Sequence, residues 1–172
     1  MRQPRKPGAT VPEACRLLAL VALGLFGAAV FYWLGRPAGS VLFLNYLPPP
    51  PLLIDNVVWR FLANHVPDLV HPFVFILLTV AVVSPTVNLG AICLFWLTVD
   101  CLMEIGQLPQ IATEIASSLP DWFGHVPVLD HVGRYFLSGT FDPLDVLATA
   151  LGCLGAYLTV SSATPGLLQK AL

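Results

Sequence analysis

Apolar residues are concentrated in four long runs, separated by stretches rich in proline and polar residues. The first run, residues 17–35, contains no charged side chain and would rise about 28 Å as a helix, enough to cross a hydrocarbon core of about 30 Å. The others are residues 69–84, 88–108 and 143–163. Their lengths predict an all-α fold, an integral membrane four-helix bundle that occupies residues 17–163.

The first run is preceded by basic residues and has aromatic residues at its C-terminal end. Arg2, Arg5, Lys6 and Arg16 precede it, and Tyr32 and Trp33 mark its far end. This arrangement is typical of a helix that enters the bilayer from the cytoplasm. A cleaved signal peptide is the competing interpretation, but the run is longer than a usual signal core and no clear cleavage site follows it. We therefore expect an uncleaved span after a cytoplasmic segment at residues 1–16.

The two outer connections carry helical patterns of their own. Residues 55–66 fit either a short helix in the membrane interface or a packed loop helix. Asp68 is placed to cap the next span, which is short, so that helix begins earlier or lies in thinned bilayer. Pro109 ends the third span. Within residues 109–141, apolar side chains recur at helical spacing at Ile111, Ile115 and Leu119.

The charges indicate how the spans are oriented. Four spans place the N-terminus and the tail at residues 164–172 on the same side. Arg2, Arg5, Lys6, Arg16 and Lys170 then lie on the cytoplasmic side, and Arg36, Arg60 and Arg134 lie outside with most of the acids. That distribution is the positive-inside bias, so we expect both termini in the cytoplasm.

Composition agrees with a membrane protein and narrows the chemistry. Hydrophobic residues make up 56% and charged residues 10% of the chain, against about 25% charged residues in soluble domains. No basic tract indicates nucleic-acid binding. The cysteines have neither zinc-like spacing nor a disulfide framework. The histidines, His65, His71, His125 and His131, have no ligand spacing. We therefore expect no metal site and no cofactor.

Three polar residues interrupt the third apolar run. Asp100, Glu104 and Gln107 are spaced at i, i+4 and i+7 and share one helix face. The stripe begins just beyond the midplane and opens toward the outer surface. A carboxylate at a helix centre raises the free energy of membrane insertion by about 2.5–3.5 kcal/mol. The apolar residues of this span lower the same free energy by roughly 4 kcal/mol in total. The carboxylates must therefore face protein or water, and a functional role is the default hypothesis.

The start of the fourth run lies at the same depth as the end of this stripe. Asp142 is an N-cap before Pro143, and Asp145 either interacts with the helix dipole or belongs to a site. His71, near the outer start of the second span, shares this level. We expect these groups to converge in an outward-facing acidic notch, where a bound cation, a shared proton or Arg134 relieves the repulsion between carboxylates.

Two motifs resemble those of the VanZ-like family, small bacterial membrane proteins named after a teicoplanin-resistance accessory protein. One is the E-x-x-Q of Glu104 to Gln107. The other is a D-x-x-x-N-x-x-G pattern at the start of the last span, which Asp145 and Gly152 match. Thr149 stands where the family usually has asparagine, so a hydroxyl replaces an amide contact there or the contact is absent.

The resemblance implies a multi-pass protein of the bacterial cytoplasmic (inner) membrane, and it names no reaction. The namesake is linked to tolerance of glycopeptide antibiotics that act at the outer face of the membrane. An acidic notch there is compatible with a cationic, amide-rich or lipid-linked envelope ligand or a lipid headgroup.

Three functions remain open at this stage. The first is binding of an envelope ligand without catalysis. The candidate binding residues are Asp100, Glu104, Gln107, Asp142, Asp145, Thr149, Arg134 and His71. The second is a membrane hydrolase or transferase that uses a carboxylate pair as general acid and base. The third is a structural subunit of a membrane complex. Homo-oligomerisation is compatible with all three.

Overall fold

The computed structural model describes residues 11–35, 56–83, 88–127 and 129–163, and within these ranges the only regular secondary structure is helical. The helices are α1 (Val11–Gly35), α2 (Val57–Val82), α3 (Leu89–Ile105), α4 (Pro109–Ser118), the 3₁₀ helices η2 (Asp121–His125) and η3 (Leu129–His131), α5 (Val132–Ser138) and α6 (Pro143–Ala163). The prediction of an all-α fold is confirmed for this part of the chain.

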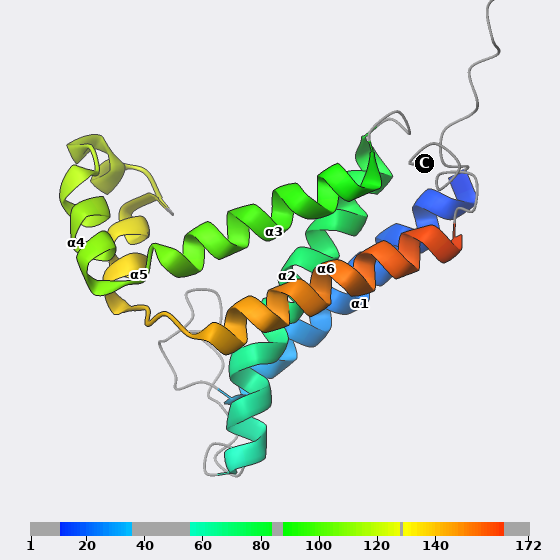
Figure 1. The fold of residues 1–172 in the computed structure, drawn as a ribbon, viewed down its shortest axis with the longest axis horizontal. Coiled ribbons are helices and arrows are strands. Elements are labelled where there is room, and N and C mark those ends of the chain that lie inside the picture. The colour runs from blue at the N-terminus through cyan, green and yellow to red at the C-terminus, as the bar shows by residue number, and fades with distance from the viewer. Residues whose placement is uncertain (1–10, 36–55, 84–87, 128, 164–172) are drawn as a thin grey trace, which may run out of the picture.

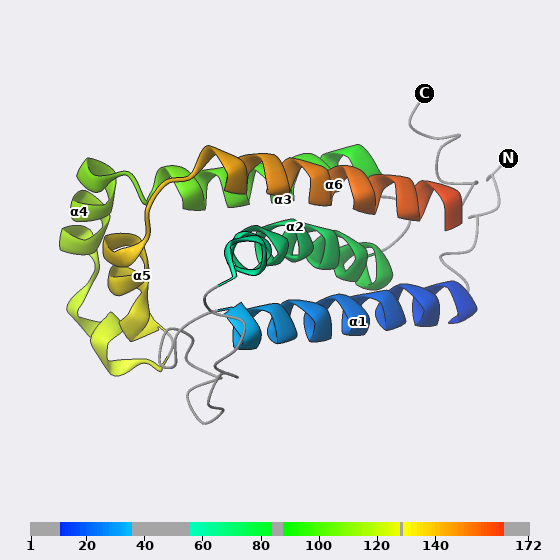
Figure 2. The ribbon, with the colours of Figure 1, turned by 90° about the horizontal axis from the view of Figure 1, so that it is seen from below.

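Helix α2 occupies the centre of the molecule. It packs against α1 on one side and against α6 and α3 on the other, which gives the three layers seen in Figure 2. Helices α3 and α6 lie side by side and antiparallel, and α1 runs antiparallel to α6 (Figure 1). The short helices α4 and α5 pack together where α3 ends and α6 begins. That end of the bundle is where the stripe of α3 meets the start of α6.

Three of the helices are long and apolar enough to cross a membrane: Ala14–Gly35 of α1, Val57–Val82, and Pro143–Ser162 of α6. Helix α3 has 17 residues and is followed by α4 at a bend of 97°. The rise of α3 alone is about 26 Å, close to the hydrocarbon thickness of about 30 Å. These lengths and compositions are those of a membrane protein.

The prediction of two separate elements at residues 55–66 and 69–84 is wrong. Residues 57–82, which include most of both stretches, form one continuous helix, α2, which Asn56 caps by accepting a hydrogen bond from the backbone N–H of Trp59 at 3.1 Å, and residues 55 and 84 lie outside the described part of the chain. Asp68 is therefore an interior helical residue and not a cap. Pro67 and Pro72 lie inside the helix. Of the two explanations offered for the short second span, an earlier start of the helix is the correct one.

A proline inside a helix leaves the carbonyl four residues earlier without its donor. For Pro72 that carbonyl belongs to Asp68. Thr149 of α6 directs its hydroxyl to the same oxygen at 3.5 Å, a long contact that nevertheless supplies a donor from a neighbouring helix. Packed membrane helices tolerate proline when nearby hydroxyls meet the freed carbonyl in this way. This explains why the helix continues through a residue that usually ends one.

Helix α3 ends three residues before the boundary that the sequence predicted at residue 108. Gly106 donates its N–H to the Leu102 carbonyl at 2.9 Å, and Leu108 then adopts an extended conformation with ψ of 134°. The residue before a proline is disfavoured in the α region, and Pro109 imposes that restriction on Leu108. Proline is favoured at the first helical position, where it begins α4 after the bend. Gln107 consequently lies in the turn between the two helices.

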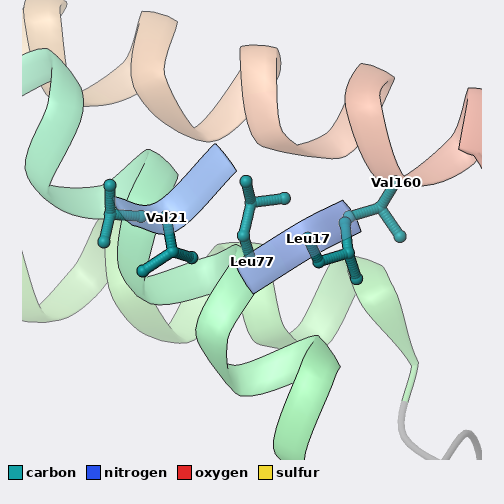
Figure 3. Packing of buried hydrophobic residues seen from close by; sticks show 5 residues of the cluster. Leu17, Val21, Leu77 and Val160 are labelled. Carbon is teal, nitrogen blue, oxygen red and sulfur yellow. The ribbon is translucent and has the colours of Figure 1, made fainter. Parts of the chain in front are cut away.

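The core lies along α2. One cluster joins α1, α2 and α6 through Leu17, Val21, Val74, Leu77 and Val160, four of which are labelled in Figure 3. A second joins α2, α3 and α6 through Ile76, Ile92, Cys153 and Ala156. Large apolar side chains cover the outer faces, among them Leu23, Phe26, Leu94, Phe95, Leu147 and Leu158. A bilayer accommodates such surfaces, whereas soluble monomers rarely expose contiguous patches of this kind.

Gly152 allows α6 to approach the backbone of α2 closely. A Cβ atom at this position would overlap the Leu69 carbonyl oxygen, which belongs to helix backbone and cannot turn aside. We expect Gly152→Ala to lower the free energy of unfolding by at least the 1–3 kcal/mol or so typical of overpacking. Thermal unfolding of the purified protein in detergent measures it. Gly155→Ala is the matched control, since its Cβ would meet only Phe73 at an ordinary 3.6 Å.

Candidate functional site

A cleft of about 640 Å³ lies between α1, α2 and α3. Tyr135 of α5 and Thr149 of α6 complete its wall. Most of the lining is apolar, contributed by Leu25, Ala28, Ala29, Val70, Val74 and Phe75. A few polar groups, including Asp100, Glu104 and His71, enter this apolar surface. A concave, mostly apolar site with a few converging polar groups is the usual form of a small-molecule site.

The predicted stripe of α3 is buried as a unit. Asp100 is 7% exposed, and Glu104 and Gln107 are each 9% exposed. On the same helix Leu94, Phe95 and Leu102 are exposed. The polar face of α3 therefore points into the bundle and its apolar face points outward. The prediction that these carboxylates face protein or water, and not lipid, agrees with this arrangement.

Each buried carboxylate uses one oxygen and leaves the other without a close partner. The Oδ1 atom of Asp100 lies 3.2 Å from Nδ1 of His71, and the Oε1 atom of Glu104 accepts a hydrogen bond from Gln107 Nε2 at 3.2 Å. The Oδ2 atom of Asp100 has no hydrogen-bond partner, and the Oε2 atom of Glu104 has no close one, although the backbone N–H of Asp142 lies near this carboxylate. A buried acceptor without a donor costs roughly 1–3 kcal/mol, and more if it is charged. Two poorly satisfied oxygens in one cleft wall call for an explanation.

Gln107 links the stripe to the second outer connection. Its Nε2 atom also donates to the Tyr135 hydroxyl at 3.1 Å. A Cβ atom on Gly139 would overlap the Gln107 amide, so the glycine is what allows this side chain to lie against the start of the loop into α6. The amide therefore joins α3 to α5, and its position depends on the turn before Pro109.

Tyr135 holds its proton to unusually high pH. Although part of the ring is exposed, burial of the hydroxyl raises its pKa to about 12, and the Glu104 and Asp68 carboxylates add to the increase. The folded protein therefore keeps a proton that the unfolded chain loses near pH 10. We expect the free energy of unfolding to fall as the pH rises from about 10 to about 12.

Tyr135→Phe removes this contribution while leaving the other tyrosines in place. Denaturant titrations of both proteins at pH 9, 11 and 12 should show a steeper loss in the wild type than in the variant. Parallel pH profiles for the two proteins would contradict this account of the Tyr135 hydroxyl.

A second polar group lies at the start of α6, next to the cleft. Asp142 accepts a hydrogen bond from the backbone N–H of Leu144 at 2.9 Å, which confirms its predicted capping role. Asp145 does more than interact with the helix dipole, since its Oδ1 atom lies 2.6 Å from Nδ1 of His65 in α2. Asp142 and Asp145 both interact electrostatically with Glu104. The start of α6 therefore lies close to the end of the α3 stripe, as its predicted depth suggested.

Not every candidate joins these groups. Arg134 lies on α5 with an exposed side chain, and it forms no ion pair within the described part of the chain. It does not relieve the repulsion between the carboxylates there. His71 does meet Asp100, as its predicted depth suggested. Thr149 is buried and bonds the Asp68 carbonyl while lining the cleft.

His65 is the site residue that sequence reasoning missed. The sequence predicted a separate helix at residues 55–66, either in the membrane interface or packed in a loop, and both interpretations placed His65 outside the bundle. Continuing the helical phase through Pro67 places His65, Asp68 and Pro72 at i, i+3 and i+7, on the face that meets α6. That periodicity was the available signal, and the proline obscured it.

No protein-family model matches the chain, and no similar curated protein or solved structure is found for it.

Proposed function

We propose that this is a four-span, VanZ-like protein of the bacterial cytoplasmic membrane, and that it binds the N–H-donating headgroup of an envelope lipid or lipid-linked ligand. In this arrangement α1, α2, α3 and α6 cross the bilayer and both termini lie in the cytoplasm. The cleft then opens toward the outer surface. The positive-inside distribution of arginine and lysine and the motif on α3 and α6 support this orientation and family.

The observation that carries the binding function is the unpartnered Oδ2 atom of Asp100 beside the Oε2 atom of Glu104, which has only a weak contact with the Asp142 backbone N–H, on two residues that are each more than nine-tenths buried. A ligand that brings N–H groups into the cleft satisfies both acceptors. Its apolar portion lies along the wall formed by Leu25, Ala29 and Val70. Such a ligand offsets a desolvation cost that the protein alone leaves uncompensated.

This chemistry predicts a preference among lipid headgroups. Bonds of the N⁺–H···O⁻ type are short and about twice as strong as neutral ones. A primary ammonium supplies such donors, whereas a quaternary trimethylammonium carries the charge without any N–H. A carboxylate-lined cleft repels a headgroup that is only anionic. The order of affinity should be phosphatidylethanolamine first, phosphatidylcholine second and phosphatidylglycerol last.

Native mass spectrometry of the protein released from mixed-lipid nanodiscs tests this order. With equal amounts of the three lipids, the retained lipid should be enriched in phosphatidylethanolamine by about tenfold or more, which corresponds to about 1.4 kcal/mol. Asp100→Asn and Glu104→Gln should each remove the enrichment. Glu114→Gln, on the exposed face of α4, should keep it. Equal retention of the three lipids, or enrichment that persists in both cleft variants, would contradict the proposal.

A hydrolase or transferase is the second candidate, and one observation favours it. Two imidazole–carboxylate pairs, His65–Asp145 and His71–Asp100, flank Glu104. Such pairs are a common way to build a general base. Incubation of the purified protein with a labelled lipid-linked precursor tests for turnover. Product formation that disappears in His71→Ala would favour catalysis over binding, and the absence of turnover would count against it.

A further inference from the structure

The cluster at the start of α6 contains a donor set that the spacing of histidines along the chain did not reveal. A ring nitrogen of His65 and one carboxylate oxygen each from Asp142 and Asp145 all lie within 4.8 Å of one another. The three residues are half-buried. His65 and Asp145 come from α2 and α6, which pack tightly, and Asp142 is fixed at the start of α6 by its capping hydrogen bond. We propose that these three side chains bind a divalent transition-metal ion, with Zn²⁺ as the representative.

The identity of the donors favours such an ion over Mg²⁺ or Ca²⁺. Imidazole nitrogen is a ligand for zinc and its first-row neighbours, whereas magnesium and calcium prefer sites made of oxygen alone. One nitrogen and two carboxylates match the three-ligand sites of zinc that keep a position open. With metal–ligand distances near 2.0 Å, tetrahedral ligand atoms lie roughly 3.3 Å apart. The 4.8 Å limit therefore requires only small side-chain rotations.

His65 and Asp145 now contact each other directly at 2.6 Å. A metal ion replaces the imidazole proton in this contact and separates the two atoms slightly. The remaining imidazole nitrogen is free to keep its own contacts. Asp142 uses one oxygen to cap α6 and keeps the second for the ion. Capping and coordination are therefore compatible in the same side chain.

Charge supplies an independent reason for a cation here. Glu104, more than nine-tenths buried, borders the cluster: it interacts electrostatically with both aspartates, and the backbone N–H of Asp142 lies near its carboxylate. Within the described ranges no lysine or arginine pairs with Glu104, Asp142 or Asp145. Three carboxylates thus face one histidine. A divalent ion neutralises this excess, while the nearby Glu104 carboxylate increases the negative potential at the site.

Metal content and zinc binding of the full chain test the proposal. The protein is purified in a neutral detergent with its affinity tag removed, stripped with chelator and titrated with ZnCl₂ by calorimetry. We expect one equivalent to bind, with a rise in the unfolding temperature, and neither millimolar Mg²⁺ nor millimolar Ca²⁺ to compete. Binding weaker by at least 100-fold is expected for His65→Ala and for Asp145→Asn.

Two variants make the result specific. Asp142→Asn preserves the cap, because asparagine caps helices as well as aspartate does, yet removes a charged ligand, so it should weaken zinc binding and leave folding intact. His71→Ala removes the other imidazole–carboxylate pair and should bind zinc normally. No zinc binding by the wild type, or binding that is unchanged in His65→Ala and Asp142→Asn, would overturn the proposal.

The proposed metal site and the proposed headgroup site can be tested independently, with different variants. Asp100 lies outside the donor set, so Asp100→Asn should lose lipid selectivity and keep zinc. His65 belongs to the donor set but does not line the cleft, so His65→Ala should lose zinc and keep lipid selectivity.

Discussion

Asp100→Leu is expected to make the protein more stable while it abolishes headgroup selectivity. Asp100 is 7% exposed, and its Oδ2 atom has no partner. Replacing a poorly satisfied buried charge with an apolar side chain of similar volume stabilises proteins by about 1–4 kcal/mol. His71 loses its contact but is half exposed, so it stays hydrated. Thermal unfolding in detergent should show a rise in the midpoint temperature.

The direction of this change separates a structural carboxylate from a functional one. A residue that is retained for binding can lower the free energy of unfolding, which is the usual trade-off between stability and activity. Asp130→Leu is the control, since that carboxylate is exposed and its replacement should change stability by no more than about 0.5 kcal/mol. A clear fall in the unfolding temperature of Asp100→Leu would show that the carboxylate supports the fold, and the binding account would lose its main support.

Leu77→Ala is expected to destabilise the fold strongly. Leu77 is completely buried on α2, in the cluster that joins this helix to α1 and α6 (Figure 3). Truncation of a buried leucine costs about 2–5 kcal/mol, in proportion to the cavity that remains. Neighbouring side chains from two other helices prevent the site from collapsing, so the upper half of that range is expected.

The matched control for this variant is Leu94→Ala. Leu94 is 63% exposed on the outer face of α3, so its truncation removes contact with detergent or lipid and leaves no internal cavity. Unfolding in a denaturing detergent should distinguish the two variants clearly. Equal effects would mean that α2 is not the central helix of the bundle.

Local signals predicted the start of α6 and the polar face of α3 well. The Asp142–Pro143 pair marks the start of α6 in the sequence and in the structure, because capping and the fixed φ of proline act within a few residues. The stripe on α3 was predictable for a similar reason. Intervals of four and three residues place side chains on one helix face whatever the rest of the chain does. Burial of that face followed from the cost of exposing carboxylates to lipid.

The continuity of α2 was not predictable from its own residues. Pro72 would normally limit a helix, and the compensating donor is the Thr149 hydroxyl, 77 positions further along the chain. Once the helix was divided, His65 had no predictable neighbour. Its contact with Asp145 depends on the close approach of α2 and α6 at Gly152, a tertiary feature. The candidate metal site therefore could not be predicted from residue spacing, because spacing motifs identify only ligands that lie near one another in sequence.

Accessibility of the cleft from outside the membrane tests the central claim most directly. In a variant without its four cysteines, single cysteines at Met103, which lines the cleft, and at Leu94, on the outer face of α3, are compared in right-side-out membrane vesicles. A membrane-impermeant maleimide should label Met103→Cys from outside and leave Leu94→Cys unmodified. Labelling of Met103→Cys only after the vesicles are opened would contradict an outward-facing cleft.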